Sequence, residues 1–261
     1  MSDEGMSKEE KRIRLAKGPF GTLASRHALR FGKAAFFGLP PRHSKGEAVN
    51  SGTITFVDLG NGPIGITCAH VMERYRQRRM EDSRIIFQIG HFDFDPLNYL
   101  IAENRELDLA TIDLGQGRME RILTPEAPGN CVHIPPRWPP QEVREGDVIL
   151  SLGGFPGAMR KTLSANNLLF GAYSISGVRV DSSSEKHFAC HFERQYWVSP
   201  NSPEESREFC EYGGLSGGPV FIDRKMYFEF AGIIKEYNEK LDVLYASKVS
   251  FIRRDGTILG A

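Results

Sequence analysis

The sequence is poor in cysteine, with four in 261 residues and no close C-x-x-C pair. A disulfide-rich secreted scaffold needs a denser set, and a zinc knuckle needs that pairing. The sequence argues against both classes. We expect free thiols at Cys68, Cys131, Cys190 and Cys210.

An excess of charge of either sign is also missing, since Lys plus Arg and Asp plus Glu number 33 each. No overall field attracts nucleic acid or an anionic membrane, so we expect neither as a partner. No stretch reaches the roughly 18 successive apolar residues of a membrane helix. The charged start of the chain lacks the apolar core of a signal peptide. We therefore expect a cytoplasmic protein.

Helical periodicity is nearly absent, apart from a short segment at residues 71–79. Short runs typical of strands, bounded by glycine, asparagine or aspartate, fill residues 51–114 and 147–250. The six prolines between them cannot supply the donors of a central strand. We predict an all-β protein with these parts: a basic N-terminal arm (1–45), a β lobe (46–123), a proline-rich connection (124–145) and a second β lobe (146–261).

A serine stands among glycines at residues 213–219, which read GGLSGGP. Nucleophilic catalysis needs a hydroxyl on a tight turn, with backbone N–H groups free nearby to bind an oxyanion, and glycine permits such a backbone. Ser216 is therefore a candidate nucleophile. A glycine-rich hairpin turn is the alternative.

Two further segments carry candidate partners for Ser216. Residues 64–71, IGITCAHV, form an apolar run that ends by presenting His70, and a base at a strand end can reach into a cleft. A polar residue at a barrel rim would look the same. Asp108 stands among apolar residues, where burial is costly without a partner such as an imidazole. Asp113 is the competing acid, and its odd offset from Asp108 puts it on the opposite face of a strand.

Together these segments resemble the trypsin-like serine peptidases, whose motifs are T-A-x-H, D-[IL]-A and G-x-S-G-G-P. They appear here as TCAH (67–70), DLA (108–110) and GLSGGP (214–219), in the family's order of His, Asp and Ser. The resemblance spans about residues 50–255. It implies a chymotrypsin-like double barrel of two six-stranded antiparallel β-barrels, with the active site in the cleft between them.

The resemblance also implies the chemistry of a non-secreted serine endopeptidase acting on a protein or peptide substrate through an acyl-enzyme. Ser216 would attack the carbonyl, His70 would carry the proton, and Asp108 would orient the ring. The N–H groups of Gly214 and Ser216 would form the oxyanion hole. No cofactor or metal is implied. The alternatives are an inactive peptidase-fold binding or scaffold module, and a competent site gated by a regulatory partner.

Several residues depart from the family pattern. Leu215 stands where secreted digestive members carry the aspartate of zymogen activation, so that switch cannot operate here. By the resemblance, Lys235 falls beside the triad acid and Tyr237 at the mouth of the specificity pocket. Cys210 falls at the pocket base, with Glu211 beside it. A neutral base and a narrowed mouth indicate a preference for small or medium apolar residues.

Other residues are weaker candidates. His187 and His191 offer metal ligands, but Cys190 between them faces the other side of a strand, so we predict no metal site. Asp93 and Asp95 share a face, although a polar turn before proline explains them as well. The arginines that follow His70 are most simply a solvated surface; they are Arg74, Arg76, Arg78 and Arg79.

Overall fold

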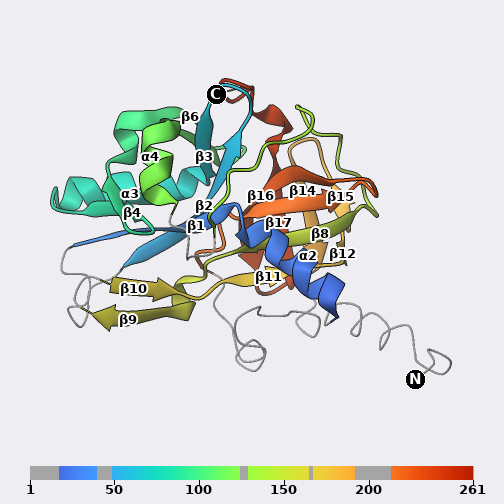
Figure 1. The fold of residues 1–261 in the computed structure, drawn as a ribbon, viewed down its shortest axis with the longest axis horizontal. Coiled ribbons are helices and arrows are strands. Elements are labelled where there is room, and N and C mark those ends of the chain that lie inside the picture. Colours follow the sequence, from blue (N-terminus) through green and yellow to red (C-terminus); the bar gives the residue numbers. More distant parts are fainter. Residues whose placement is uncertain (1–17, 40–48, 124–128, 165–166, 192–212, 261) are drawn as a thin grey trace.

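The computed structural model of the chain describes residues 18–39, 49–123, 129–164, 167–191 and 213–260. Two antiparallel β-sheets dominate it, one on each side of Figure 1. The predicted all-β organisation in two lobes is confirmed.

The first sheet has seven strands in the order β5-β4-β1-β2-β3-β7-β6. Their bounds are β1 Gly32–Gly38, β2 Asn50–Asp58, β3 Pro63–Thr67, β4 Ile86–Ile89, β5 Phe92–Phe94, β6 Leu100–Asn104 and β7 Leu109–Asp113. Two helices belong to this lobe, α3 (Ala69–Glu81) and α4 (Gly115–Ile122), with a short 3-10 helix, η1 (Pro96–Tyr99). Phe37, Phe56, Phe87, Ile54 and Ile66 are fully buried in the core of this lobe.

The second sheet has eight strands in the order β11-β8-β15-β16-β17-β14-β13, with β12 also paired to β8. Their bounds are β8 Val148–Gly154, β11 Tyr173–Ile175, β12 Val178–Arg179, β13 Ser182–Ser183, β14 His187–His191, β15 Pro219–Asp223, β16 Phe228–Asn238 and β17 Val243–Lys248. A separate hairpin joins β9 (Arg160–Ser164) to β10 (Asn167–Phe170), and two more 3-10 helices are η2 (Gly157–Met159) and η5 (Val249–Phe251). A second apolar core lies on this sheet and includes Ile149, Leu152, Tyr173, Val220 and Leu244.

The predicted N-terminal arm is wrong for residues 18–38. They form the helix α2 (Pro19–Leu29) and the strand β1, whose seven residues are all buried between β2 and β4. Ser151 of β8 fixes α2, since its Oγ accepts from the N–H of Ala28 and donates to the carbonyl of Ser25. Residues 34–37, which are apolar, thus lie in a core strand, because a buried strand needs no alternating polar residues. Residues 1–17 and 40–45 lie outside the described residues.

The strand numbers also differ from the predicted six in each barrel. The first sheet gains β1 from the supposed arm. The second gains strands of only two residues, β12 and β13, at its margins.

The connection between the lobes is pinned along its described length. His133 donates its backbone N–H to Phe56 and accepts from that of Asp58, while the Trp138 indole donates to the carbonyl of Ile252 at 2.8 Å. Within residues 129–147 the structure shows no strand of the two sheets, as the prolines led us to predict.

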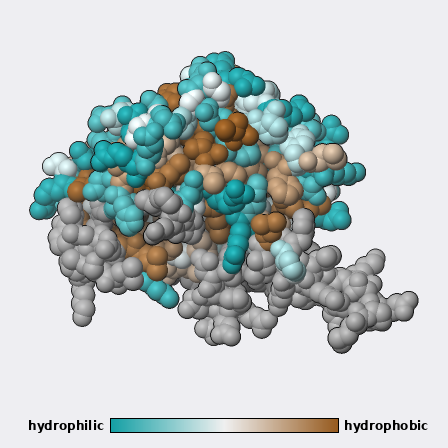
Figure 2. Space-filling model, in the orientation of Figure 1, coloured by the Kyte–Doolittle hydropathy of each residue, from teal (hydrophilic) through white to brown (hydrophobic). Residues whose placement is uncertain are grey.

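Among the helices of the described residues, none is long and apolar enough to cross a bilayer. On the face in Figure 2, hydrophobic residues lie scattered among hydrophilic ones.

Candidate active site

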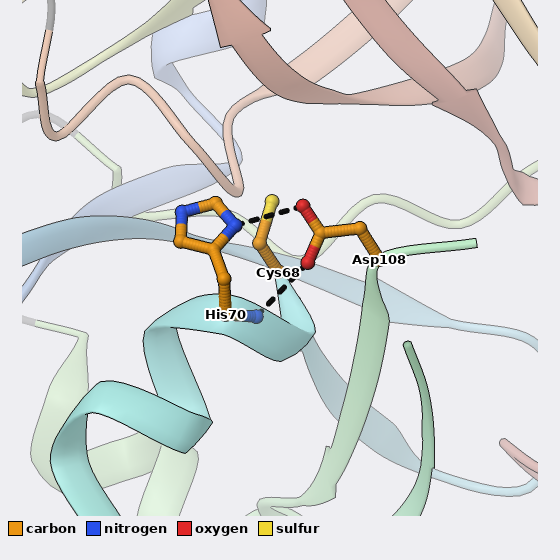
Figure 3. Close-up of side chains that lie close together, drawn as sticks. All are labelled: Cys68, His70 and Asp108. Carbon is orange, nitrogen blue, oxygen red and sulfur yellow. Dashed lines mark hydrogen bonds and ion pairs between the residues drawn. The ribbon is translucent and has the colours of Figure 1, made fainter. Parts of the chain in front are cut away.

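His70 is the second residue of α3. Strand β3 ends just before this helix, and Cys68 is the N-cap residue between them. The first amides of a helix have no acceptor within the helix. Here the backbone N–H of His70 donates to Oδ1 of Asp108 at 2.9 Å, and the ring Nδ1 lies 2.7 Å from Oδ2 (Figure 3). An ionised carboxylate can only accept, so Nδ1 is the donor, and in the neutral imidazole this leaves Nε2 as an acceptor.

Asp108 lies in the turn between β6 and β7 with a left-handed backbone (φ 53°), which is uncommon for aspartate. Its side chain is 9% exposed, against 52% for His70. Burial alone raises the pKa of Asp108. The hydrogen bonds and charge of His70, with a smaller contribution from Lys235, outweigh it and leave the pKa below its ordinary value.

The competing acid, Asp113, lies at the far end of β7 and is exposed to solvent. Its Oδ2 pairs with Arg118 at 3.3 Å. The structure therefore brings Asp108, and not Asp113, to His70.

Ser216 lies in the loop that precedes β15, and β2 of the other lobe holds this loop in place. The N–H of Thr53 donates to the carbonyl of Ser216, its Oγ1 to that of Gly214, and Oγ1 of Thr55 to that of Gly217, each at 2.8 Å. Gly217 has φ 97°, and a Cβ there would lie 1.8 Å from the Thr53 carbonyl. Only glycine fits so close an approach.

Two peptide units beside the nucleophile, Gly213–Gly214 and Leu215–Ser216, are each held in place by a hydrogen bond to their carbonyl. The carbonyl of Gly213 accepts from Gly157 at 2.8 Å, and that of Leu215 accepts from Gly218 at 2.9 Å. In a trans peptide the N–H points opposite to the C=O, so the N–H groups of Gly214 and Ser216 point away from these partners. Among the described residues neither N–H has an acceptor.

The hydroxyl of Ser216 donates to the backbone carbonyl of Lys235 in β16 at 2.9 Å. All three candidate triad residues nevertheless line one pocket of about 500 Å³. Its walls come from both lobes and consist of His70, Arg105, Asp108, Gly213, Ser216, Lys235, Glu236, Tyr237 and Glu239.

Two antiparallel β lobes thus enclose a pocket, with a His–Asp pair from the first and a serine on a glycine loop from the second. The chain has a chymotrypsin-like fold.

Comparisons with known proteins give no match to any protein-family model. No curated protein matches either. Among solved structures, the chain is similar to the active form of the Rv3671c protease from M. tuberculosis, at 15% identity, covering 90% of this chain and 81% of that one, with a TM-score of 0.41. The chain is also similar to the thermostable serine protease AL20 from an extremophilic microorganism, at 12% identity. That match covers 84% of this chain and 91% of that one, with a TM-score of 0.45. A third similar structure is a catalytically inactive tobacco etch virus protease complexed with substrate, at 14% identity. That match covers 86% of this chain and 81% of that one, with a TM-score of 0.44. Likenesses this distant decide nothing about chemistry, which rests on the residues of this chain.

Two of the predicted pocket residues line the chymotrypsin-like cleft. Among the described residues, Lys235 makes no ion pair with Asp108. Both carboxylate oxygens of Asp108 bind His70. Its charge acts on Asp108 without contact. The Tyr237 hydroxyl donates to Asp242, which holds the tyrosine ring within the β16–β17 hairpin. Cys210 and Glu211 lie outside the described residues.

Asp95 and two of the arginines of α3 have local partners near the surface. Oδ1 of Asp95 caps η1 by accepting from the N–H of Leu97, and the other oxygen pairs with Arg79 at 3.6 Å. Arg76 pairs with Glu73 and Glu103. These contacts describe a solvated helix face with its own counter-charges.

Sequence reasoning missed Cys68 as a member of this site. Its Sγ donates to the carbonyl of Ile234 at 3.1 Å, and it is fully buried next to the His70–Asp108 pair. Burial, with a further contribution from the charge of Asp108, raises the pKa of the thiol well above its ordinary value. The available signal was the motif itself, since TCAH places cysteine where T-A-x-H has alanine.

Proposed function

We propose that this protein is a serine endopeptidase in which Ser216 is the nucleophile, His70 the general base and Asp108 the residue that orients it. The observation that carries the proposal is the single pocket shared by Ser216 and the His70–Asp108 pair. The two N–H groups without acceptors beside Ser216 add a place for an oxyanion.

The first step needs a rotation of the Ser216 side chain from the Lys235 carbonyl toward Nε2 of His70. Oγ then bonds to the substrate carbonyl carbon while its proton passes to Nε2, and Asp108 stabilises the resulting imidazolium. The substrate oxygen, now negative, accepts from the N–H groups of Gly214 and Ser216. Collapse breaks the C–N bond, Nε2 gives its proton to the leaving amine, and an acyl-enzyme remains for water to hydrolyse by the same steps.

A fluorophosphonate probe tests this proposal directly, because only a serine activated by its base reacts fast. We expect labelling of Ser216 in the wild type and its loss in His70→Ala. A folded wild type that is never labelled would refute the proposal.

The second candidate function is a binding or scaffold module that keeps the fold without hydrolysis. The bond from the Ser216 hydroxyl to the Lys235 carbonyl favours it, because this hydroxyl is engaged away from the base. The same probe separates the two candidates, since a scaffold needs no reactive serine.

We further propose a protein or peptide substrate with a small or medium apolar residue before the scissile bond, because Tyr237 lines the pocket. A peptide library profiled on the wild type and on Tyr237→Gly tests this, and the variant should accept larger residues.

On composition alone, we also propose a cytoplasmic location. A regulatory partner that controls access to the site is a further part of the proposal. Cell fractionation tests the location.

A further inference from the structure

Cys68 lies beside the His70–Asp108 pair, and the proposed chemistry gives it no role. Its Sγ, a ring nitrogen of His70 and a carboxylate oxygen of Asp108 all lie within 4.8 Å of one another. Figure 3 shows the sulfur directed toward the space between the imidazole and the carboxylate.

We propose that Cys68, His70 and Asp108 form an inhibitory binding site for Zn²⁺ or a cation of similar softness. Thiolate sulfur, imidazole nitrogen and carboxylate oxygen are the ligand types that zinc takes in proteins. In a tetrahedral zinc site with normal bond lengths, the ligand atoms stand roughly 3.3–3.7 Å apart. The His70 ring is half exposed and can move by the small amount needed. A water from the pocket that His70 and Asp108 line would be the fourth ligand.

Binding changes the protonation of two groups. The thiol loses its proton to solvent, and the proton on Nδ1 of His70 moves to Nε2 so that Nδ1 can bind the cation. Each cation bound therefore releases one proton. With Nε2 protonated, His70 cannot accept the proton of Ser216. The binding stands by itself, whereas the inhibition rests on the proposed peptidase function.

Cys190 provides a matched control. It is also a buried free thiol, but it belongs to no group of three metal-type ligands among the described residues. Cys68→Ala should keep the fold, because alanine is the residue that the T-A-x-H motif carries at that position.

The test titrates the full chain with Cd²⁺, whose bond to a thiolate gives a charge-transfer band in the ultraviolet. We expect a saturable band at one equivalent, with one proton released, in the wild type, in Ser216→Ala and in Cys190→Ala. The band should vanish in Cys68→Ala. Asp108→Asn should weaken cadmium binding by about tenfold or more. Zn²⁺ should also suppress fluorophosphonate labelling, at concentrations about tenfold lower or more for the wild type than for Cys68→Ala.

An equal band in folded Cys68→Ala, or none in the folded wild type, would overturn the site. A cadmium band in a protein that the fluorophosphonate never labels would support the metal site and reject the peptidase. Labelling that zinc leaves unchanged in a cadmium-binding protein would reject the inhibition.

Discussion

Asp108 holds the ring of His70 and the first turn of α3 with one carboxylate. The backbone of this residue is left-handed, a conformation that costs free energy outside glycine and is retained where the surroundings enforce it. The turn before β7 thus places the acid, and the acid places the base.

Replacing Ser216 by alanine should abolish probe labelling and lower turnover by about 10⁴- to 10⁶-fold. The change removes the nucleophile and one hydrogen bond to the Lys235 carbonyl, so stability should fall by only about 1 kcal/mol. Intact-mass detection of the labelled protein and a thermal melt measure the two effects. Alanine at the exposed Ser182 is the control, and turnover persisting in Ser216→Ala would contradict the assignment.

The two acids of this segment should respond very differently to asparagine. Asp108→Asn misorients the ring of His70, so kcat should drop by about 10⁴-fold. It also weakens the contact to the first turn of α3, which costs about 0.5–2 kcal/mol. Asp113→Asn breaks only an exposed pair with Arg118 and should leave activity within about twofold. The rates of peptide hydrolysis by the two variants, measured side by side, test this prediction. A larger loss in Asp113→Asn than in Asp108→Asn would identify Asp113 as the acid.

At the scale of elements, strand β2 of the first lobe shapes the nucleophile loop of the second. Oγ1 of Thr53 donates to the Gly214 carbonyl and accepts from the N–H of Phe155. A loop rich in glycine has little stiffness of its own. Its geometry therefore depends on the hydrogen bonds that cross between the lobes.

Thr53→Val should therefore reduce activity as well as stability. It leaves the Gly214 carbonyl and the Phe155 N–H without their partner, at a cost of about 1–3 kcal/mol in urea unfolding. Thr111→Val is the matched control, because Oγ1 of Thr111 is equally buried and donates to the carbonyl of Gly256 instead. We expect both variants to lose stability and only Thr53→Val to lose labelling rate. Equal labelling in the two would show that the cross-lobe bonds do not shape the site.

Two histidines in the aromatic contacts between α2, the connection and the second sheet should make stability depend on pH. Burial lowers the pKa of both His27 and His133 from 6.5 to about 4. The charge of Arg30 lowers the pKa of His27 further, and the charge of His27 lowers that of His133 further. Nε2 of each is buried without a partner among the described residues. Between these pKa values the unfolded chain binds more protons than the folded one, so stability falls as the pH drops from 6.5 toward 4.

The melting temperature should therefore decrease across that window. The double variant His27→Phe/His133→Phe should flatten the decrease, whereas His91→Phe at an exposed position should not. The contribution of Asp108 is lost at lower pH, below its ordinary pKa of 3.8, because its folded pKa is depressed. An unchanged slope in the double variant would mean that other groups control acid stability.

On the scale of the whole molecule, residues 18–38 join the two lobes, with α2 on β8 and β1 inside the first sheet (Figure 1). Leu215, which precedes the nucleophile, is buried in the second core. No charged amino terminus is needed at that position, so the chain should be competent without processing.

A tag added before residue 1 should leave fluorophosphonate labelling intact, whereas deletion of residues 1–38 should abolish both labelling and cooperative melting. The deletion removes β1, the partner of β2 and β4, and so exposes two strand edges. It also removes α2, which uncovers the part of β8 around Ser151. A chain that reacts only after trimming at a defined site would contradict the first expectation. A deletion variant that still melts cooperatively would contradict the second.

The sequence by itself determined the two β lobes, the position of the connection and the three candidate catalytic residues, because strand periodicity, proline and short motifs are local signals. It could not reveal that β1 is a core strand, since a fully buried run of apolar residues near basic ones resembles a linker. It also missed α2 and α4, because helices of 11 and 8 residues that contain glycine offer few turns from which to read a helical period. Only the tertiary structure decided that Asp108 faces His70, that Thr53 holds the Ser216 loop and that Cys68 adjoins the pair. Pairing within the first sheet brings Asp108 to His70 and Cys68. Packing of the two lobes brings Thr53 to the Ser216 loop. Both join segments distant in sequence, which no local signal reveals.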